Sequence, residues 1–256
     1  MSANSSKLIL PSLSLSALII VLSTNCYNCT SFKLLPTIIF NTWKSSVRAG
    51  TGLIGGKFAM DVRLSRVLSD GFIDRASSNL KSFYLSGSYV GKKSLIKAVA
   101  FSGKERTYQS WYGTPESVIK GDADEMNAYA DRNYLSDVER ANLLESGRTY
   151  NYYTYQDEVD NYQQDNYQLH FTHTFSPKTT LNVAGHYTKG RGYYEQYKFG
   201  ENLSEYGLSD VIVGGDTVTI TDLIRRRWLD NRFYVVTTSI SHTKKDLAMS
   251  IGSSFS

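Results

Sequence analysis

The sequence predicts an all-β protein, an antiparallel meander of about eight strands that forms part of the wall of a transmembrane β-barrel, with a short helix in one long extracellular loop. Three observations predict this fold. Apolar residues recur at every second position in successive segments. Short and long connections between these segments alternate along the chain. Tyrosine dominates the aromatic residues, with 19 Tyr against 11 Phe and 3 Trp, and tyrosine suits strands and the boundary between apolar and wet surroundings.

Residues 1–39 differ from the rest of the chain, and we expect them to be an atypical N-terminal segment ahead of a β domain at residues 40–256. Leu8–Leu22 reads LILPSLSLSALIIVL. This apolar run of about fifteen residues is short for a membrane-spanning helix. It resembles a signal peptide only weakly, because Lys7 is a thin basic region and no A-x-A-like cleavage site follows.

Cys26 and Cys29 form a single C-x-x-C in this N-terminal segment. A zinc site needs further ligands at suitable spacing, and the nearest histidine is His170. We interpret the two cysteines as incidental and expect neither a metal site nor a redox motif.

The stretch Ala49–Phe58, AGTGLIGGKF, contains a formal G-x-G-x-x-G. A dinucleotide site requires a helix to begin at the third glycine. Instead Phe58, Met60, Val62 and Leu64 alternate with polar or small residues, which is the period of a strand. The glycines are therefore predicted to turn a hairpin rather than to bind a phosphate.

Alternating patterns continue from this turn to the end of the chain and predict four hairpins in series. The predicted strands after the glycine turn are Phe58–Arg66, Leu80–Val90, Ser94–Gly103, Tyr167–Phe175, Leu181–Thr188, Phe233–His242 and Leu247–Phe255.

The connections predict the orientation of the strands. Short turns are expected around Gly52, Lys92, Lys178 and Lys245, and long connections over residues 69–79, 109–156 and 197–226. Long loops at one end and short turns at the other are typical of outer-membrane barrels. A tilted strand spans a bilayer in about 9–11 residues. Strands that run longer than this should project beyond the membrane on the loop side.

Polar residues opposite the apolar rows indicate a wet lumen. Asp61, Arg63 and Gln168 all lie opposite such a row. Lys97 is an exception, since it shares a face with Val99 and its apolar neighbours, and we expect it near the periplasmic turn. A soluble sandwich with one wet face per sheet would give the same alternation.

The long connection 109–156 is predicted to contain a short helix. Ser136 and Glu139 form an S-x-x-E capping box ahead of residues 140–145. Gly147 stands where the helix would end.

Other polar groups in the sequence do not predict catalysis or metal binding. Asp122, Asp124 and Glu125 lack the ligand order of a calcium loop, so a solvated acidic loop is expected. His170 and His186 supply two ligands without a third. The net charge of +4 arises from 28 basic and 24 acidic residues, and no basic stripe with interleaved aromatics is present. We therefore expect no nucleic-acid partner, no metal, no cofactor and no enzymatic activity.

Arg225–Arg227 form a run of three cations that leads into Trp228. We interpret this run as a solvated loop edge that meets acidic groups.

Tyrosines gather on both sides of the hairpin formed by Tyr167–Phe175 and Leu181–Thr188, at the long-loop rim. An aromatic girdle at the membrane interface and a ligand-contacting vestibule both fit this pattern, and the two interpretations stay open. The tyrosines concerned are Tyr150, Tyr152, Tyr153, Tyr155, Tyr162, Tyr187, Tyr193, Tyr194 and Tyr197.

Two motifs carry a resemblance to a known family. Ser69–Ala76 reads SDGFIDRA and Gly190–Tyr197 reads GRGYYEQY. With the segments around them, from about Phe40 to the end of the chain, they resemble the barrel of TonB-dependent outer-membrane receptors, and the Bacteroidetes-type members in particular.

The resemblance implies a twenty-two-stranded barrel, an N-terminal plug and a TonB box, and the import of an iron chelate, haem, cobalamin, a glycan or another scarce nutrient. Neither a plug nor a TonB box is recognisable before Phe40, and about eight strands follow it. We therefore expect a partial barrel in the outer membrane, in contact with lipid, whose TonB partner and unidentified small nutrient belong to an intact receptor. Ligand contact is expected from loops and strand ends, at Trp111, Tyr112, Tyr129, Tyr152, Tyr153, Arg191, Tyr193 and Tyr194.

Two alternatives remain open at the level of the sequence. One is a small closed eight-stranded barrel that acts as an anchor or adhesin. The other is a soluble β-sandwich that binds glycans through its tyrosines.

Overall fold

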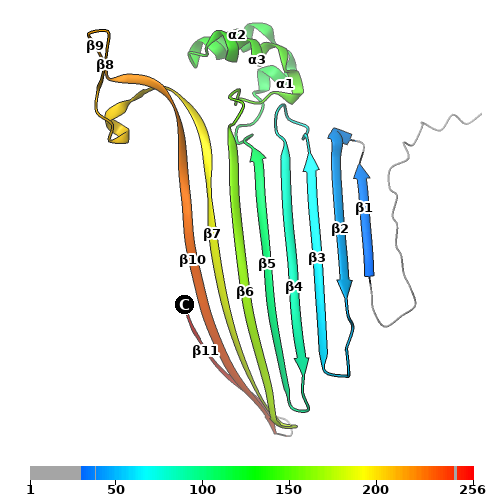
Figure 1. Ribbon diagram of the computed structural model, residues 1–256. Helices are drawn as coiled ribbons and strands as arrows, with labels where there is room; N and C mark the ends of the chain where they lie inside the picture. Colours follow the sequence, from blue (N-terminus) through cyan, green and yellow to red (C-terminus); the bar gives the residue numbers. More distant parts are fainter. Residues whose placement is uncertain (1–29, 38, 245–246) are drawn as a thin grey trace, which may run out of the picture.

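The described part of the chain, in this computed structural model, is residues 30–37, 39–244 and 247–256, and it forms one long curved sheet with helices above one end (Figure 1). The apolar run Leu8–Leu22, the pair Cys26 and Cys29, and the turn at Lys245 lie outside the described residues. Within the described ranges, no helix is long and apolar enough to cross a membrane.

The main sheet is an antiparallel meander, as predicted. Its order is β1-β2-β3-β4-β5-β6-β7-β10-β11, and eight of its strands follow residue 40. The described strands form one sheet with β1 and β11 at its edges, besides the small hairpin β8-β9, and not two layers of a sandwich. The main strands are β1 (Thr30–Thr37), β2 (Thr42–Gly50), β3 (Phe58–Ser69), β4 (Ser78–Val90), β5 (Ser94–Tyr108), β6 (Val159–Ser176), β7 (Thr179–Asn202), β10 (Ile220–Lys244) and β11 (Leu247–Phe255).

Strand β1 lies within residues 1–39, which the sequence analysis distinguished from the β domain. It pairs with β2 along its whole length, from Thr30 opposite Ala49 to Thr37 opposite Thr42. The sheet therefore begins ahead of residue 40, and the proposed domain boundary there stays a prediction.

The glycine cluster turns the chain between β2 and β3, as predicted. Gly52, Gly55 and Gly56 have φ of +61°, +56° and +67°. These values are in the left-handed region, which glycine adopts without a steric penalty. The strand β3 follows at once, so no helix N-terminus is present here to face a phosphate.

The long connections emerge at the end of the sheet that carries the helices (Figure 1). Two of them are shorter than predicted. Residues 70–77 link β3 to β4. Residues 203–219 link β7 to β10, because β7 and β10 both continue into the predicted loop 197–226. Apolar and polar residues do not alternate regularly in these strand ends, so the period of two gives no signal there.

The connection between β5 and β6 holds three helices, where the sequence predicted one. The predicted helix is α3 (Asp137–Glu145), and its Ser136–Glu139 capping box is present in both directions. Gly147 follows it with φ of +57°. The two missed helices are α1 (Glu116–Lys120) and α2 (Ala123–Arg132). The remaining elements are the 3-10 turns η1 (Ile39–Asn41), η2 (Gly147–Thr149) and η3 (Leu203–Tyr206) and the short strands β8 (Val211–Val213) and β9 (Asp216–Val218).

The acidic group at Asp122 marks the start of α2 rather than an acidic loop. The carboxylate of Asp122 accepts a hydrogen bond from the backbone N–H of Glu125 at 3.1 Å. Asp124 and Glu125 occupy the first turn, where negative charge interacts favourably with the helix dipole. An N-cap followed three residues later by Glu was a signal for this helix that the sequence interpretation missed.

Asp122→Ala is expected to destabilise α2 locally by about 1 kcal/mol, because the mutation removes its side-chain cap. Hydrogen exchange of the α2 backbone amides measures this change. Asp124→Ala is the matched control, since Asp124 lies in the same turn without capping it. Equal losses in the two variants would contradict a capping role for Asp122.

The sheet has two chemically different faces. The apolar face carries Phe58, Met60 and Leu64 of β3, which are 55%, 54% and 57% exposed. The register places Phe83, Leu85, Ile96, Tyr167, Leu169, Phe171, Val183 and Tyr187 on the same face of the neighbouring strands. An apolar surface this extensive marks an interaction with a partner or a lipid phase.

The other face, the polar face, carries Asp61, Arg63 and Gln168 as predicted. Lys97 lies on it too, opposite Ser88 on one side and His170 on the other. Lys97 shares a face with Val99, as predicted, but that face is the polar one, because the residues of β5 on the apolar face are Ile96 and Ala98.

Side chains of the polar face are hydrogen-bonded to one another along β6 and β7. Thr188 donates to Asn166 at 2.7 Å and contacts the His186 ring at 2.8 Å, and Gln168 contacts the other His186 nitrogen at 3.2 Å. Asn166 and Thr188 are buried, and their polar groups are paired within this face, as buried polar groups require.

Candidate functional site

The candidate site lies at the loop end of the sheet, where the β5–β6 connection folds back onto the strands. Arg75, in the β3–β4 connection, holds it in place. Its guanidinium donates to the backbone oxygens of Tyr153 and Asn151 at 3.0 and 3.1 Å and to the Asn142 amide oxygen at 3.0 Å. Arg75 belongs to the SDGFIDRA motif, so part of this motif anchors the helical loop.

Asn151 is fully buried and completes the same anchor. Its amide nitrogen donates to the backbone oxygens of Asp74 and Gln109 at 2.9 and 3.0 Å, and its amide oxygen accepts from the Tyr153 N–H at 3.1 Å. One side chain thus links the β3–β4 connection, the end of β5 and the start of the aromatic segment. Sequence reasoning missed both Arg75 and Asn151, because neither stands in a periodic pattern.

The helices above this anchor pack on a small core of their own. Its buried members are Val118, Met126, Ala130, Leu143 and Tyr150, with Tyr129, Leu135 and Tyr152 packed against it. Tyr129, one of the predicted ligand-contact residues, therefore supports the helices.

Most of the other predicted ligand-contact residues meet in one aromatic cluster, which we define as Trp111, Tyr112, Tyr152, Tyr153 and Tyr194. The Trp111 ring lies 5.6 Å from Tyr194 and 6.3 Å from Tyr153, both edge-on. The Tyr112 ring lies 4.8 Å from Tyr152.

Exposure divides the aromatic cluster by role. Trp111 and Tyr112 are 57% and 62% exposed, whereas Tyr153 is 8% exposed. Burial raises the pKa of Tyr153 and of Tyr152 above the ordinary tyrosine value. These two phenols therefore stay neutral. The exposed rings of Trp111 and Tyr112 pack against them.

A cation lies beside this cluster. Tyr194 lies on the polar face, on the same side of β7 as Thr188. The Arg227 guanidinium lies over the Tyr194 ring, 5.7 Å from its centroid. A guanidinium over an aromatic face is an attractive cation–π contact. The cluster and Arg227 together offer flat apolar surface and one positive charge, next to the carboxylate of Asp160, which lies opposite Tyr194 and is hydrogen-bonded to Trp111.

Arg191 and Tyr193, predicted as ligand contacts, lie on the opposite side of β7 from Tyr194, because adjacent strand residues point to opposite faces. They accompany Trp228: the Tyr193 ring lies 4.9 Å from Trp228 and Arg191 stands 5.4 Å over it. Apart from Tyr129, which packs against the helix core, the structure thus separates the predicted ligand residues into two groups.

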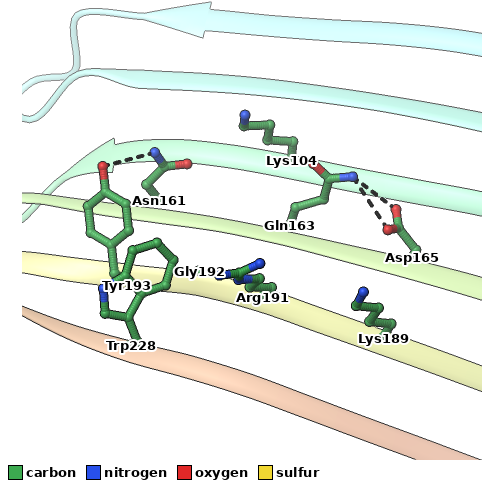
Figure 2. Close-up of a pocket in the computed structure, with 9 residues that line it drawn as sticks. All are labelled: Lys104, Asn161, Gln163, Asp165, Lys189, Arg191, Gly192, Tyr193 and Trp228. Atoms are coloured by element: carbon green, nitrogen blue, oxygen red, sulfur yellow. Dashed lines mark hydrogen bonds between the residues drawn. The ribbon is translucent and has the colours of Figure 1, made fainter.

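Arg191 and Tyr193 line a hollow of about 360 Å³ on this side of the sheet. Figure 2 shows the side chains that line it. Asn161 donates to the Tyr193 hydroxyl at 3.3 Å and Gln163 donates to Asp165 at 3.1 Å. Its lining residues are Lys104, Asn161, Gln163, Asp165, Lys189, Arg191, Gly192, Tyr193 and Trp228.

Arg225–Arg227 lie within strand β10, so the predicted loop edge was wrong, although Arg226 does meet an acidic group as predicted. Arg225 donates to Gln196 at 2.9 Å, and Arg226 forms an ion pair with Glu195 at 2.5 Å. The three cations point to opposite sides of the strand in turn, so they do not form one anion patch.

Glu195 is a buried carboxylate with two partners, Arg226 and the hydroxyl of Tyr155, which donates at 2.9 Å. Burial and then this hydrogen bond raise the pKa of Tyr155 to about 12. Tyr155 therefore remains a donor over the whole physiological range.

Glu158 is a second buried carboxylate, 3% exposed, and it accepts a hydrogen bond from the Tyr197 N–H at 3.2 Å. Burial raises its pKa above the ordinary glutamate value. Because the folded state holds the proton more tightly, stability from this group is full below the unfolded pKa of about 4.3 and falls as pH rises through the raised folded pKa.

Glu158→Gln is expected to remove this local pH dependence and to protect the loop base at neutral pH, since the amide keeps an acceptor without the buried charge. The measurement is hydrogen exchange at the Tyr197 amide, corrected for intrinsic rates, from neutral pH down to about 4.3. Asp157→Asn, at an adjacent exposed carboxylate, is the control. A slope unchanged in Glu158→Gln would refute the assignment.

The described residues include no group of three or more His, Cys, Asp or Glu side chains placed to hold a metal ion. His186 bonds to Gln168 and Thr188 instead.

Comparisons with known proteins show the fold. The sheet is similar to the ferric-catecholate import receptor Fiu from E. coli K12. The closed form of Fiu superposes with a TM-score of 0.52 at 15% identity, over 80% of this chain and 27% of the receptor. The open form gives 0.54 at 13% identity, over 82% and 31%.

The sheet of this chain therefore has the fold of part of a β-barrel. It spans less than a third of the length of the receptor chains it matches. No protein-family model and no curated protein matches the sequence. The narrower Bacteroidetes-type resemblance stays a prediction.

Proposed function

We propose that this chain forms part of the barrel wall of an energy-coupled outer-membrane receptor that imports a scarce nutrient. The observation that carries the proposal is the two-faced sheet: a continuous apolar face opposite a hydrogen-bonded polar face. Strands β6, β7 and β10 have 18, 24 and 25 residues. A bilayer takes about 9–11 residues of a tilted strand, so these strands project well beyond it, as in large receptor barrels with long external loops.

Partners follow from the same proposal. Lipid covers the apolar face, and the TonB complex acts on the intact receptor through segments that lie elsewhere. A small nutrient reaches the polar face from the loop end.

The aromatic cluster favours an aromatic, anionic metal chelate among the candidate nutrients. Trp111 and Tyr112 offer exposed rings that stack on a planar ligand, and Arg227 supplies a positive charge beside them. The similar receptor Fiu is named for ferric-catecholate import, and a ferric catecholate has this aromatic, anionic character. Glycan recognition also uses aromatic rings, but a glycan gains less from the adjacent cation.

Titration of the full chain in detergent with a ferric catecholate complex tests this proposal, with a neutral oligosaccharide for comparison. Trp111→Ala should weaken binding of the chelate about tenfold, the effect of losing about 1.4 kcal/mol of stacking. Trp43→Ala, at an exposed tryptophan of β2 far along the sheet from the cluster, is the matched control. Equal binding by the two variants, or tighter binding of the oligosaccharide, would contradict the proposal.

A further inference from the structure

A row of cations crosses the apolar face one or two residue pairs to the loop side of Leu64, Phe83 and Tyr187. We call it the cation row. All six members have exposed side chains, and they come from β3, β4, β5, β7 and β10: Arg66, Lys81, Lys104, Lys189, Arg191 and Arg232.

The register sets three of these cations directly opposite one another. Arg66 pairs with Lys81, and Lys81 pairs with Lys104. Directly opposed residues on one face have Cβ atoms about 4.5–5.5 Å apart, and like charges in such positions destabilise a sheet. Lys104 then faces Gln163, which faces Arg191, so the row continues across the next two strands.

Carboxylates within the sheet compensate this charge only in part. Asp165 lies opposite Lys189 and accepts hydrogen bonds from Ser102 at 2.5 Å and from Gln163 at 3.1 Å, and Asp230 lies opposite Arg191. Among the described residues, no member of the cation row forms an ion pair. The row therefore keeps an excess of positive charge that an external anion would stabilise.

The hollow in Figure 2 lies within the row and provides room for a head group. Lys104, Lys189 and Arg191 line it together with Tyr193 and Trp228. Cations beside amphipathic rings fit an anionic group attached to an apolar body.

The position of the row specifies the source of the anion. Tyr167 and Tyr187 stack at 6.3 Å on the same face, one step before Asp165 and Lys189 along their strands. Aromatic residues mark the membrane interface, and Lys and Arg just beyond them meet anionic head groups. An apolar band, then tyrosines, then cations follows the order of layers in a lipid leaflet.

We propose that the cation row binds the phosphate groups of anionic lipids in the leaflet on the loop side. This inference rests on the proposed function, because it needs the apolar face to lie in a membrane. The bound phosphates neutralise the opposed cations of β3, β4 and β5 and so stabilise the wall at its outer boundary.

The test uses the full chain in phosphatidylcholine vesicles with a minor fraction of spin-labelled phosphatidic acid or spin-labelled phosphatidylcholine. The fraction of immobilised label gives the relative affinity for the two lipids. We compare wild type with the triple variant Arg66→Gln, Lys81→Gln, Lys104→Gln. The matched control removes three cations from the polar face, as Lys44→Gln, Arg63→Gln, Lys97→Gln. Lys189→Gln with Arg191→Gln is a second variant on a different strand, should the triple variant fail to fold.

Wild type and control are expected to prefer phosphatidic acid by about tenfold, and both cation-row variants should lose most of this preference. An equal preference in the variants, or none in wild type, would overturn the inference. Displacement of the lipid by an equal amount of inorganic phosphate would overturn it too, because the site would then recognise a free anion.

Carbonate-resistant insertion into pure phosphatidylcholine vesicles separates this inference from the proposed function. A chain that does not insert refutes the membrane wall itself. A chain that inserts and shows no preference for phosphatidic acid refutes only the lipid site.

Discussion

Replacing Gly192 by alanine is expected to destabilise the β6–β7 pairing by about 3 kcal/mol, one of the two largest effects predicted for this chain. A Cβ at Gly192 would overlap the backbone oxygen of Asn161 and lie 2.5 Å from the Cα of Tyr162. Backbone atoms cannot rotate away as a side chain can, so the strands must separate.

Glycine is required at this position because Tyr162 of β6 lies directly opposite Gly192 of β7. Its hydroxyl donates to Asn231 on β10 at 2.8 Å, so one ring connects three strands. The expected result is earlier unfolding in urea and faster hydrogen exchange at the top of β6 and β7. Gly185→Ala is the matched control on the same strand, since nothing lies within 4 Å of a Cβ there. Equal stability of the two variants would contradict this account of the GRGYYEQY motif.

Arg75→Ala is expected to release the helical loop, at a local cost of about 2 kcal/mol. The guanidinium makes three hydrogen bonds to the loop, and hydrogen bonds to charged groups are worth about 1.5–3 kcal/mol each when buried, less where the side chain is exposed as here. Arg75→Lys keeps the charge without the planar fork and should fall between wild type and alanine.

Limited proteolysis of residues 109–158 in the full chain measures the release of the loop. Arg148→Ala, at an exposed arginine of the same loop, is the control. Because the loop carries Trp111 and Tyr112, Arg75→Ala should also weaken binding of the ferric catecholate. Unchanged proteolysis in Arg75→Ala would show that the loop is held by its own core.

The sequence predicted the sheet well where one face is apolar and the other polar. Leu169 and Gln168 lie on the faces that alternation predicted for them. Where the two faces differ in polarity, apolar and polar residues alternate along the strand, so the sequence shows which face each residue occupies. Beyond Tyr197 on β7 this contrast ends, and the sequence there was interpreted as a loop although the strand continues to Asn202.

The candidate site was predicted only in part. Trp111 and Tyr194 come from distant segments and are in contact. The sequence had indicated only that aromatic residues gather at the loop end of the sheet. Tyr193 and Tyr194 point to opposite faces because they are adjacent residues of one strand. This could not be predicted without knowing that β7 extends through both of them. Arg75 and Asn151 act through backbone oxygens, which carry no sequence signal, so only the structure shows their role.

The central claim is that the apolar face lies in lipid and the polar face in a wet lumen. Single cysteines at successive positions of β6, from Gln168 to Phe171, test it most directly, in a chain with Cys26 and Cys29 replaced by serine. Each is labelled with a fluorophore in vesicles. We predict that a lipid-attached quencher reaches positions 169 and 171 and a water-soluble quencher reaches positions 168 and 170. Equal quenching at all four positions, or the reverse pattern, would contradict the membrane-wall account.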